Sequence, residues 1–210
     1  MTILAFEFSS ARRSVALARD GIVLAEAAET GGYRVTNAFG LTGKVLAEAK
    51  VFREEVGVIA VGIGPGSYTG IRAAIAIAQG WQLARDVKLL GISSAEVLAA
   101  QAQAEKLFGR VNVIIDAQRG EFYLSALEIS ADERQEISPL KIVSAAEVEA
   151  LKSAGEICVG PEMERNLFPS AAMLAQLAAS RTDFIAGEKL EPIYLRETTF
   201  VKAAPLARIY

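Results

Sequence analysis

Three apolar segments at the start of the chain predict an antiparallel β-meander. Residues 2–8, 13–19 and 22–30 carry mostly apolar side chains, in continuous runs or in alternation with polar ones. The dipeptide Asp20-Gly21 lies between the second and third segments, and it is a strong signal for a two-residue hairpin turn. We therefore expect three consecutive strands, each antiparallel to the one before it.

The residues that follow alternate between strand and helix patterns. The continuous apolar run at 56–63 is typical of a strand that is covered on both faces. A glycine-rich loop, Gly64 to Gly70, comes next, and Ser67 within it is expected to cap a long helix. These patterns predict helices at 36–50, 67–85 and 93–108 and strands at 56–63 and 87–91. The order βββαβαβα is that of a ribonuclease-H-like unit, which indicates a fold and not a function.

The second half of the chain repeats this order. Residues 113–116 resemble residues 3–7, because each is an apolar segment that ends on a carboxylate. A Gly-Pro pair ends a later apolar strand in both halves, at Gly64-Pro65 and at Gly160-Pro161. The repeated patterns are strands at 111–116, 121–129 and 156–159, the end of a further strand at 140–143, and helices at 144–152 and 170–181.

Two such units that face each other across a cleft form the actin-like architecture. The predicted fold class is therefore α/β, a duplicated ribonuclease-H-like, actin-like (ASKHA) fold with a shortened second unit. We place the boundary near Gly109. Residues 1–108 are expected to form the first subdomain, which bears the interface helices, and residues 109–210 the shortened second subdomain with a C-terminal tail.

Composition and charge exclude several classes of function. The 22 basic and 25 acidic residues give a net charge of −3, which disfavours direct, tight binding to nucleic acid. The chain has no histidine, so histidine-ligated zinc and the Ser-His-Asp triad are excluded. No metal site is predicted, and a metal would have to bind carboxylates, as magnesium does.

The sequence also favours a reducing, aqueous compartment. The single cysteine, Cys158, cannot form a disulfide within the chain, and we interpret it as a small buried apolar side chain. No apolar stretch reaches the length of a membrane span, and the first residues lack the basic region of a signal peptide. We therefore expect a cytoplasmic protein that contacts no membrane.

The glycine-rich loop is one candidate anion site. A loop of this kind leaves backbone N–H groups free at the positive end of the helix dipole, which suits phosphate or carboxylate. Gly64, Gly66 and Ser67 would provide the site, although no lysine follows in the way that a P-loop requires. The alternative is a tight turn that uses glycine where φ is positive, and spacing alone favours the turn.

The carboxylates at two strand ends, Glu7 and Asp116, are a second candidate. In an actin-like cleft such groups hold magnesium or orient a water near nucleotide phosphates. Ser9 and Ser10 follow Glu7 in a hairpin that would face the phosphates. The alternative is a carboxylate that accepts hydrogen bonds from its own turn. Glu7 is longer than the aspartate usual in such hairpins, which weakens the geometry for a metal.

The helix predicted at 67–85 has two interpretations. One face of it is formed by residues at i, i+3, i+4 and i+7 spacing, namely Ile71, Ala74, Ile75 and Ala78. The simpler interpretation is that this face packs on the sheet of its own unit. Alternatively, the small residues around Tyr68, Arg72 and Gln79 present a surface to a partner, since tyrosine and arginine often anchor interfaces.

Four segments of the chain form an ordered set of motifs. They are ILAFEFSSARRSVAL at 3–17, GPGSYTGIR at 64–72, IDAQRGEFY at 115–123 and PIYLR at 192–196. Together they resemble the TsaB family, also called YeaZ, and the glycine-rich segment is the most specific of the four. The chain departs from the family pattern at Glu7, where aspartate is usual, and at Gln118, where arginine is usual.

The resemblance implies a role in the bacterial pathway that makes threonylcarbamoyladenosine beside the anticodon of tRNAs. It implies a homodimer in isolation and a complex with the paralogous TsaD subunit, which the ATPase TsaE joins. The helices at 36–50 and 67–85 would form the dimer and partner surface. The candidate interface residues on these helices are Leu41, Val45, Tyr68, Ile71, Arg72, Ile75 and Gln79.

The resemblance implies that the paralogue TsaD, and not this chain, carries out the catalytic step. The catalytic paralogue holds its metal with histidines, which this chain lacks, so the chain is expected to be a non-catalytic scaffold that activates TsaD. No catalytic residue and no cofactor bound by the chain alone are expected. ATP and magnesium would act in the complex, and tRNA would be bound only through it. The alternative is a self-sufficient actin-like, nucleotide-dependent phosphotransferase or ATPase.

Overall fold

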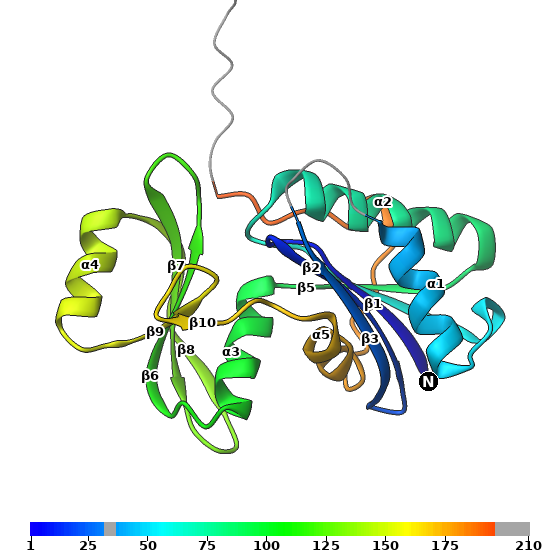
Figure 1. The fold of residues 1–210 in the computed structure, drawn as a ribbon, viewed down its shortest axis with the longest axis horizontal. Helices are drawn as coiled ribbons and strands as arrows, with labels where there is room; N and C mark the ends of the chain where they lie inside the picture. The colour runs from blue at the N-terminus through cyan, green and yellow to red at the C-terminus, as the bar shows by residue number, and fades with distance from the viewer. Residues whose placement is uncertain (32–36, 196–210) are drawn as a thin grey trace, which may run out of the picture.

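The computed structural model describes residues 1–31 and 37–195, and these residues form two five-stranded sheets with helices around them (Figure 1). The first sheet has the order β3-β2-β1-β4-β5. Strands β1, β2 and β3 are antiparallel neighbours, and β4 and β5 extend the sheet parallel to β1. The strands are β1 (Thr2–Glu7), β2 (Arg12–Arg19), β3 (Ile22–Thr30), β4 (Val58–Gly62) and β5 (Lys88–Ile92).

The second sheet repeats the arrangement of the first. Its order is β10-β9-β6-β7-β8, with β6 central, β7 and β8 antiparallel on one side, and β9 and β10 parallel on the other. The strands are β6 (Gly109–Asp116), β7 (Glu121–Ile129), β8 (Arg134–Ser144), β9 (Ile157–Gly160) and β10 (Arg165–Asn166). The predicted duplicated ribonuclease-H-like, actin-like fold is therefore confirmed.

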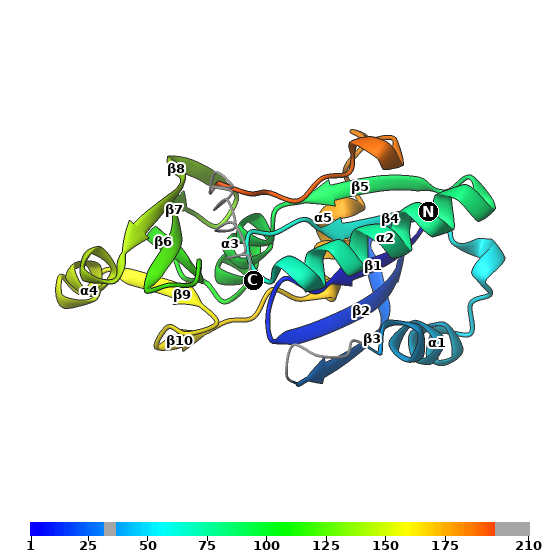
Figure 2. The same cartoon turned by 90° about the horizontal axis from the view of Figure 1, so that it is seen from above.

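The helices lie on defined faces of the two sheets (Figures 1 and 2). Helices α1 and α2 cover one face of the first sheet, and α5 covers the other. Helices α3 and α4 pack on opposite faces of the second sheet. They are α1 (Ala38–Ala49), α2 (Tyr68–Arg85), α3 (Ser94–Ala104), α4 (Ala145–Ser153) and α5 (Ala171–Ala178), with 3-10 turns at Arg53–Glu55 and Gly187–Lys189.

Two helices cross between the halves of the chain. Helix α3 follows the first sheet in sequence, yet Leu98, Ala99 and Ala102 pack against the second sheet. Helix α5 follows the second sheet, yet Leu174 and Ala175 pack against the first. A division at residue 109, where we expected the two subdomains to meet, therefore separates the sheets but not the helices that cover them.

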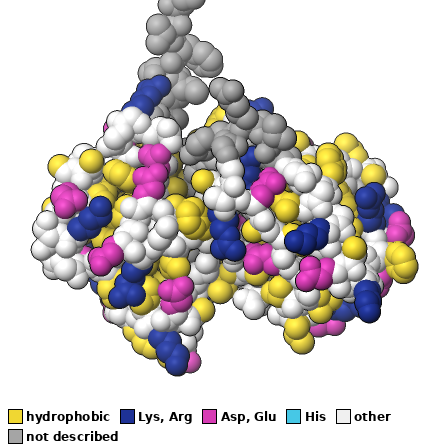
Figure 3. All heavy atoms as spheres, in the orientation of Figure 1, with side chains coloured by type: hydrophobic (Ala, Val, Ile, Leu, Met, Phe, Trp, Pro, Cys, Tyr) yellow, Lys and Arg dark blue, Asp and Glu magenta, His cyan; other side chains and the backbone are white. Residues whose placement is uncertain are grey.

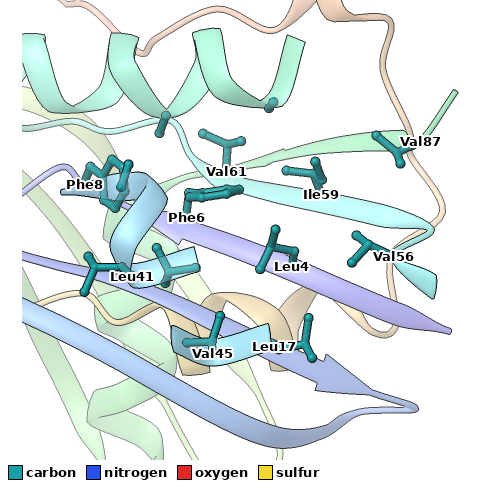
Figure 4. Close-up of a cluster of buried hydrophobic side chains, with 14 of the residues drawn as sticks. Leu4, Phe6, Phe8, Leu17, Leu41, Val45, Val56, Ile59, Val61 and Val87 are labelled. Atoms are coloured by element: carbon teal, nitrogen blue, oxygen red, sulfur yellow. The ribbon is translucent and has the colours of Figure 1, made fainter. Parts of the chain in front are cut away.

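The main core lies between the first sheet and helices α1 and α2. Figure 4 shows Phe6 from β1 and Val61 from β4 in this core, with Leu41 and Val45 from α1 packed beneath them. Phe6 also meets the ring of Phe8 edge-on, at 5.8 Å between the ring centroids. Successive side chains of a strand point to opposite faces of the sheet. The core residues therefore alternate along each strand with the residues that pack on α5.

Serine side chains cap four of the helices, and one of them is Ser67, where the sequence predicted a cap. Ser67, Ser93, Ser144 and Ser170 each accept a hydrogen bond from a backbone N–H in the first turn of the following helix. The predicted helix 93–108 is shorter than expected. It ends at Ala104, since Lys106 adopts a left-handed conformation with φ of 60°.

Strand β8 begins well before the segment that its pattern indicated. Residues 140–143 were expected to be the end of a strand, and the structure shows the whole strand, from Arg134 to Ser144. Charged residues at its start hide the apolar alternation, because β8 is an edge strand with mostly exposed side chains. The first residue of the helix expected at 36–50 lies outside the described residues, and the helix is observed from Ala38.

The N-terminus of α5 is tied to the first sheet by side chains. The N–H of Ala171 donates to Ser14 Oγ at 2.8 Å, and the N–H of Ala172 donates to Glu26 Oε1 at 3.1 Å. Ser14 lies on β2 and is buried. These two bonds satisfy N–H groups that have no partner inside the helix, and so they fix where α5 docks.

We predict that Ser14→Ala lowers the free energy of unfolding by about 1–3 kcal/mol, because it leaves the buried N–H of Ala171 unpaired. Urea denaturation measures the effect. The control is Ser153→Ala at the exposed end of α4, which should change stability by less than about 0.5 kcal/mol. Equal losses in the two variants would contradict the assigned role of Ser14.

Candidate functional site

A cleft of about 810 Å³ lies where the two halves of the molecule meet. This volume is in the range of small-molecule binding sites. Segments from both sheets form the walls: the β1–β2 hairpin at 9–11, the glycine-rich loop at 66–69, the β6–β7 hairpin at 115–119, the residues Tyr123, Phe168 and Tyr194, and the pair Pro161-Glu162.

Close backbone contacts fix the wall of the cleft that the β1–β2 hairpin and the glycine-rich loop form. The N–H of Ser67 donates to the carbonyl oxygen of Ser9 at 2.6 Å, which holds the start of α2 against the hairpin. Gly66 has φ of 144°, and a Cβ atom there would lie 2.2 Å from the same oxygen. Only glycine fits at this position, so the tight-turn interpretation accounts for Gly66 without a ligand.

Four of the six predicted anion-binding residues line the cleft, namely Ser9, Ser10, Gly66 and Ser67. Glu7 and Gly64 are not among the lining residues. Glu7 is fully buried, and burial raises the pKa of its carboxyl group above the ordinary value. Its oxygens accept hydrogen bonds from the N–H of Ser9 and the hydroxyl of Ser94, so Glu7 does not face a ligand in the cleft.

The wall of the cleft that the β6–β7 hairpin and the pair Pro161-Glu162 form carries the charged side chains of the described lining. Asp116 accepts hydrogen bonds from the backbone N–H of Gln118 at 2.7 Å and from its side-chain amide at 2.5 Å, so its own turn occupies both oxygens. Gln118 and Arg119 have φ of 66° and 60°, a left-handed conformation that costs a residue with a Cβ atom about 1–2 kcal/mol. This turn presents Arg119 at the cleft, opposite the glycine-rich loop.

The charged side chains at the cleft are of both signs. Among the described residues that line it, Arg119 is cationic, and Asp116 and Glu162 are acidic. Among the described residues no group of histidine, cysteine, aspartate and glutamate is placed to hold a metal ion. On the face shown in Figure 3, basic and acidic side chains are interspersed.

Aromatic side chains form a part of the cleft that the sequence analysis missed. Tyr68 stacks on Tyr194, with 5.2 Å between ring centroids, and Arg72 donates a hydrogen bond to the Tyr68 hydroxyl at 2.7 Å. The N–H of Ile193 donates to the carbonyl of Ile63 at 2.9 Å, and this bond holds the C-terminal segment in place. The motif at 192–196 contained the signal for Tyr194, but spacing alone does not show that it returns to α2.

The structure corrects the placement of the predicted interface residues. Leu41, Val45, Ile71 and Ile75 are buried in the core of this chain. The assignment of Ile75 to the partner surface is wrong, because the stripe of Ile71, Ala74, Ile75 and Ala78 faces the first sheet. The simpler interpretation of the stripe is therefore correct, and Ile75→Glu would disrupt the fold itself.

The other predicted interface residues differ among themselves. Tyr68 and Arg72 are exposed and remain candidates for contact with a partner. Gln79 is partly buried, and its side-chain amide donates to the carbonyl of Gly187 at 2.8 Å. This bond gives Gln79 a role inside the chain.

The outward face of α2 consists of small residues. We call it the α2 outer face and define it by its members at alternating four- and three-residue steps: Thr69, Ala73, Ala76, Gly80 and Leu83. Leu83 is 90% exposed, and on the neighbouring α1 Phe39 is 78% exposed. A Cβ atom built on Gly80, or on Gly43 of α1, would meet no heavy atom within 4 Å. The fold of this chain alone therefore gives no steric reason for glycine at these positions.

No helix within the described residues is long and apolar enough to cross a membrane. Cys158 is buried, and burial raises the pKa of its thiol, which agrees with its interpretation as an apolar side chain.

Comparisons with known proteins place the chain in a family. A family model described as TsaD, tRNA N6-adenosine threonylcarbamoyltransferase, matches residues 21–194. The tRNA threonylcarbamoyladenosine biosynthesis protein TsaB of Haemophilus influenzae is 30% identical over 190 residues, which cover 77% of this chain and 79% of that protein. The Escherichia coli protein of the same name is 32% identical over 123 residues, which cover 59% of this chain and 53% of that protein.

A solved structure agrees with these matches. YeaZ from Pseudomonas aeruginosa superimposes with a TM-score of 0.78 and 26% identity, over 92% of this chain and 99% of that one. The match to the Escherichia coli relative spans only about half of that relative's length. From the family model, the Haemophilus relative and the fold together, we conclude that the chain belongs to the TsaD family and, within it, to the TsaB (YeaZ) group.

Proposed function

We propose that this chain is a non-catalytic subunit of the machinery that makes threonylcarbamoyladenosine in tRNA, and that it acts by binding and activating a TsaD-type paralogue. The names of its relatives support the pathway. The observation that carries the proposed mode of action is the α2 outer face, which is exposed, rich in small residues and unexplained by the chain's own packing.

Helix energetics support a partner on this face. Glycine inside an exposed helix is about 1 kcal/mol less favourable than alanine. Gly43 and Gly80 both carry this penalty, and neither position is crowded within the chain. Small side chains at this spacing let another helix approach closely, and Leu83 and Phe39 supply apolar groups that a partner would bury.

The proposed partner shares the architecture of this chain. A model described as TsaD matches most of the present sequence, so a TsaD-type protein is expected to present two helices equivalent to α1 and α2. Such helices can pack about an approximate two-fold axis, as identical surfaces do in a symmetric dimer. We propose that the same face forms the homodimer in isolation and that the paralogue replaces the second copy.

The residues of the cleft support the proposal that nucleotide and metal are bound in the complex and not by this chain alone. Glu7 is buried away from the cleft lining, and both oxygens of Asp116 accept hydrogen bonds from Gln118, so each carboxylate already has a role within the chain. We propose that the chain alone binds no nucleotide, that ATP, magnesium and the ATPase TsaE enter at the level of the complex, and that tRNA is contacted through the complex.

We predict that Ala76→Arg weakens association by on the order of tenfold or more, because it places a long charged side chain at the centre of the α2 outer face. Light scattering measures the homodimer, and pull-down measures the paralogue. The control is Ala146→Arg on the exposed surface of α4, which should leave both associations unchanged. Unchanged association of Ala76→Arg, with its thermal melt intact, would remove the proposed surface.

We also predict that cells depleted of this protein lose threonylcarbamoyladenosine from their tRNAs. Mass spectrometry of digested tRNA measures the loss. Expression of the wild-type chain should restore the modification, and the Ala76→Arg chain should restore less of it. Normal modification in depleted cells would overturn the proposed pathway.

Calorimetry with Mg-ATP separates this proposal from a self-sufficient phosphotransferase or ATPase. We expect no micromolar binding to the purified chain and no ATP turnover, since the described part of the cleft lining has one cationic side chain and two acidic ones. Micromolar binding accompanied by hydrolysis would favour the enzyme.

A further inference from the structure

Glu7 is buried beneath the start of α3, the helix that leads from the first sheet to the second. It is the last residue of β1, and its side chain has no exposed surface. One carboxylate oxygen accepts a hydrogen bond from the N–H of Ser9 at 2.9 Å. The other accepts one from the hydroxyl of Ser94 at 3.0 Å, and Ser94 is equally buried.

The two elements that Glu7 connects pack on different sheets. Strand β1 is the central strand of the first sheet. Ser94 is the first residue of α3, whose side chains Leu98, Ala99 and Ala102 lie against the second sheet. The bond between Glu7 and Ser94 therefore joins β1 to the point where the chain leaves β5 and enters the helix that packs on the second sheet.

Other bonds at this junction are weaker or less specific constraints. The N–H of Ser94 donates to the carbonyl of Gly64 at 2.7 Å, which is a backbone contact that any residue at 94 makes. Arg181 bonds Glu96 at 3.2 Å, but both side chains are partly exposed. Within the residues that the structure describes, Glu7–Ser94 is the one fully buried bond between side chains that links α3 to the first sheet.

The surroundings of Glu7 fit a side chain of this length. A Cβ atom at Gly62, the last residue of β4, would lie 2.0 Å from the carboxylate oxygen that bonds Ser94. The chain therefore has glycine where the longer acid passes on its way to α3. An aspartate, which is one methylene shorter, would not extend past β4 to α3 in the same way.

The other hydrogen-bond partner of Glu7, Ser9, connects this contact to the cleft. Ser9 lines the cleft, and its carbonyl oxygen accepts the N–H of Ser67 at 2.6 Å, directly before α2. A continuous series of hydrogen bonds thus runs from α3 through Glu7 and Ser9 to the start of α2. Such contiguous networks are able to transmit a change of position between packed elements.

We propose that Glu7 is a latch between the two halves: it holds the start of α3 against β1 and thereby fixes the width of the cleft and the position of the first turn of α2.

The latch depends on side-chain length rather than on charge. A serine hydroxyl is both a donor and an acceptor, so Ser94 is able to donate to a carboxylate or to accept from an amide. Glu7→Gln therefore keeps both contacts, with its carbonyl oxygen toward Ser9 and its amide toward Ser94. Glu7→Asp keeps the bond to the N–H two residues ahead and loses Ser94.

Distance measurements between spin labels test the latch in the full chain. Labels are attached to Glu48→Cys on α1 and Ala150→Cys on α4, two exposed positions on different halves, with Cys158→Ala in every sample and unlabelled protein added to dilute the labels. We expect a narrow distance distribution for Glu7 and for Glu7→Gln. We expect Glu7→Asp and Ser94→Ala to broaden it to the same extent, and the double variant to be no broader than either single one.

Two results would overturn the latch. One is a distribution in Ser94→Ala as narrow as that of the unaltered chain, with a normal circular dichroism spectrum. The other is broadening in Glu7→Gln equal to that in Glu7→Asp, which would make charge the controlling property. Should Glu7→Asp fail to fold, the comparison of Ser94→Ala with Glu7→Gln still decides the question.

Discussion

The exchange of two helices between the halves of the molecule is the constraint on which the rest of the structure depends. Helix α3 covers the sheet that follows it, and α5 covers the sheet that precedes it. Each sheet would expose an apolar face if the other half were absent, and exposed apolar surface of that kind is unfavourable in water. The halves therefore need each other to complete their cores, and the cleft forms at the junction that this exchange creates.

Duplication gives the halves one topology, but the surroundings of equivalent residues differ. Glu7 and Asp116 both end the central strand of a sheet. The start of α3 covers Glu7, which becomes a buried connection between elements, whereas Asp116 stays at the cleft and is occupied by its own turn. Equivalent positions have therefore acquired different roles, because the first half has a full set of helices over this point and the shortened second half does not.

The sequence predicted the order of elements and most of their limits, since apolar periodicity and serine caps are local signals. It predicted the hairpin at Asp20-Gly21, where both residues have positive φ. It did not predict on which sheet α3 and α5 pack, because the apolar periodicity of a helix does not identify the surface against which the helix packs. For the same reason Ile75 was assigned to the surface, and only the position of the first sheet shows that it is buried. Tyr194 was missed because its contact with Tyr68 joins residues far apart in sequence.

Helix α2 is the element on which the proposed action of this chain on a partner depends. Its inner face, with Ile71 and Ile75, belongs to the main core, and its outer face is small and exposed. Its first residues, Tyr68 and Thr69, line the cleft. A protein bound on the outer face therefore rests on a helix that is fixed to the sheet and begins at the cleft. The proposed contact surface and one edge of the cleft are therefore joined through a single helix.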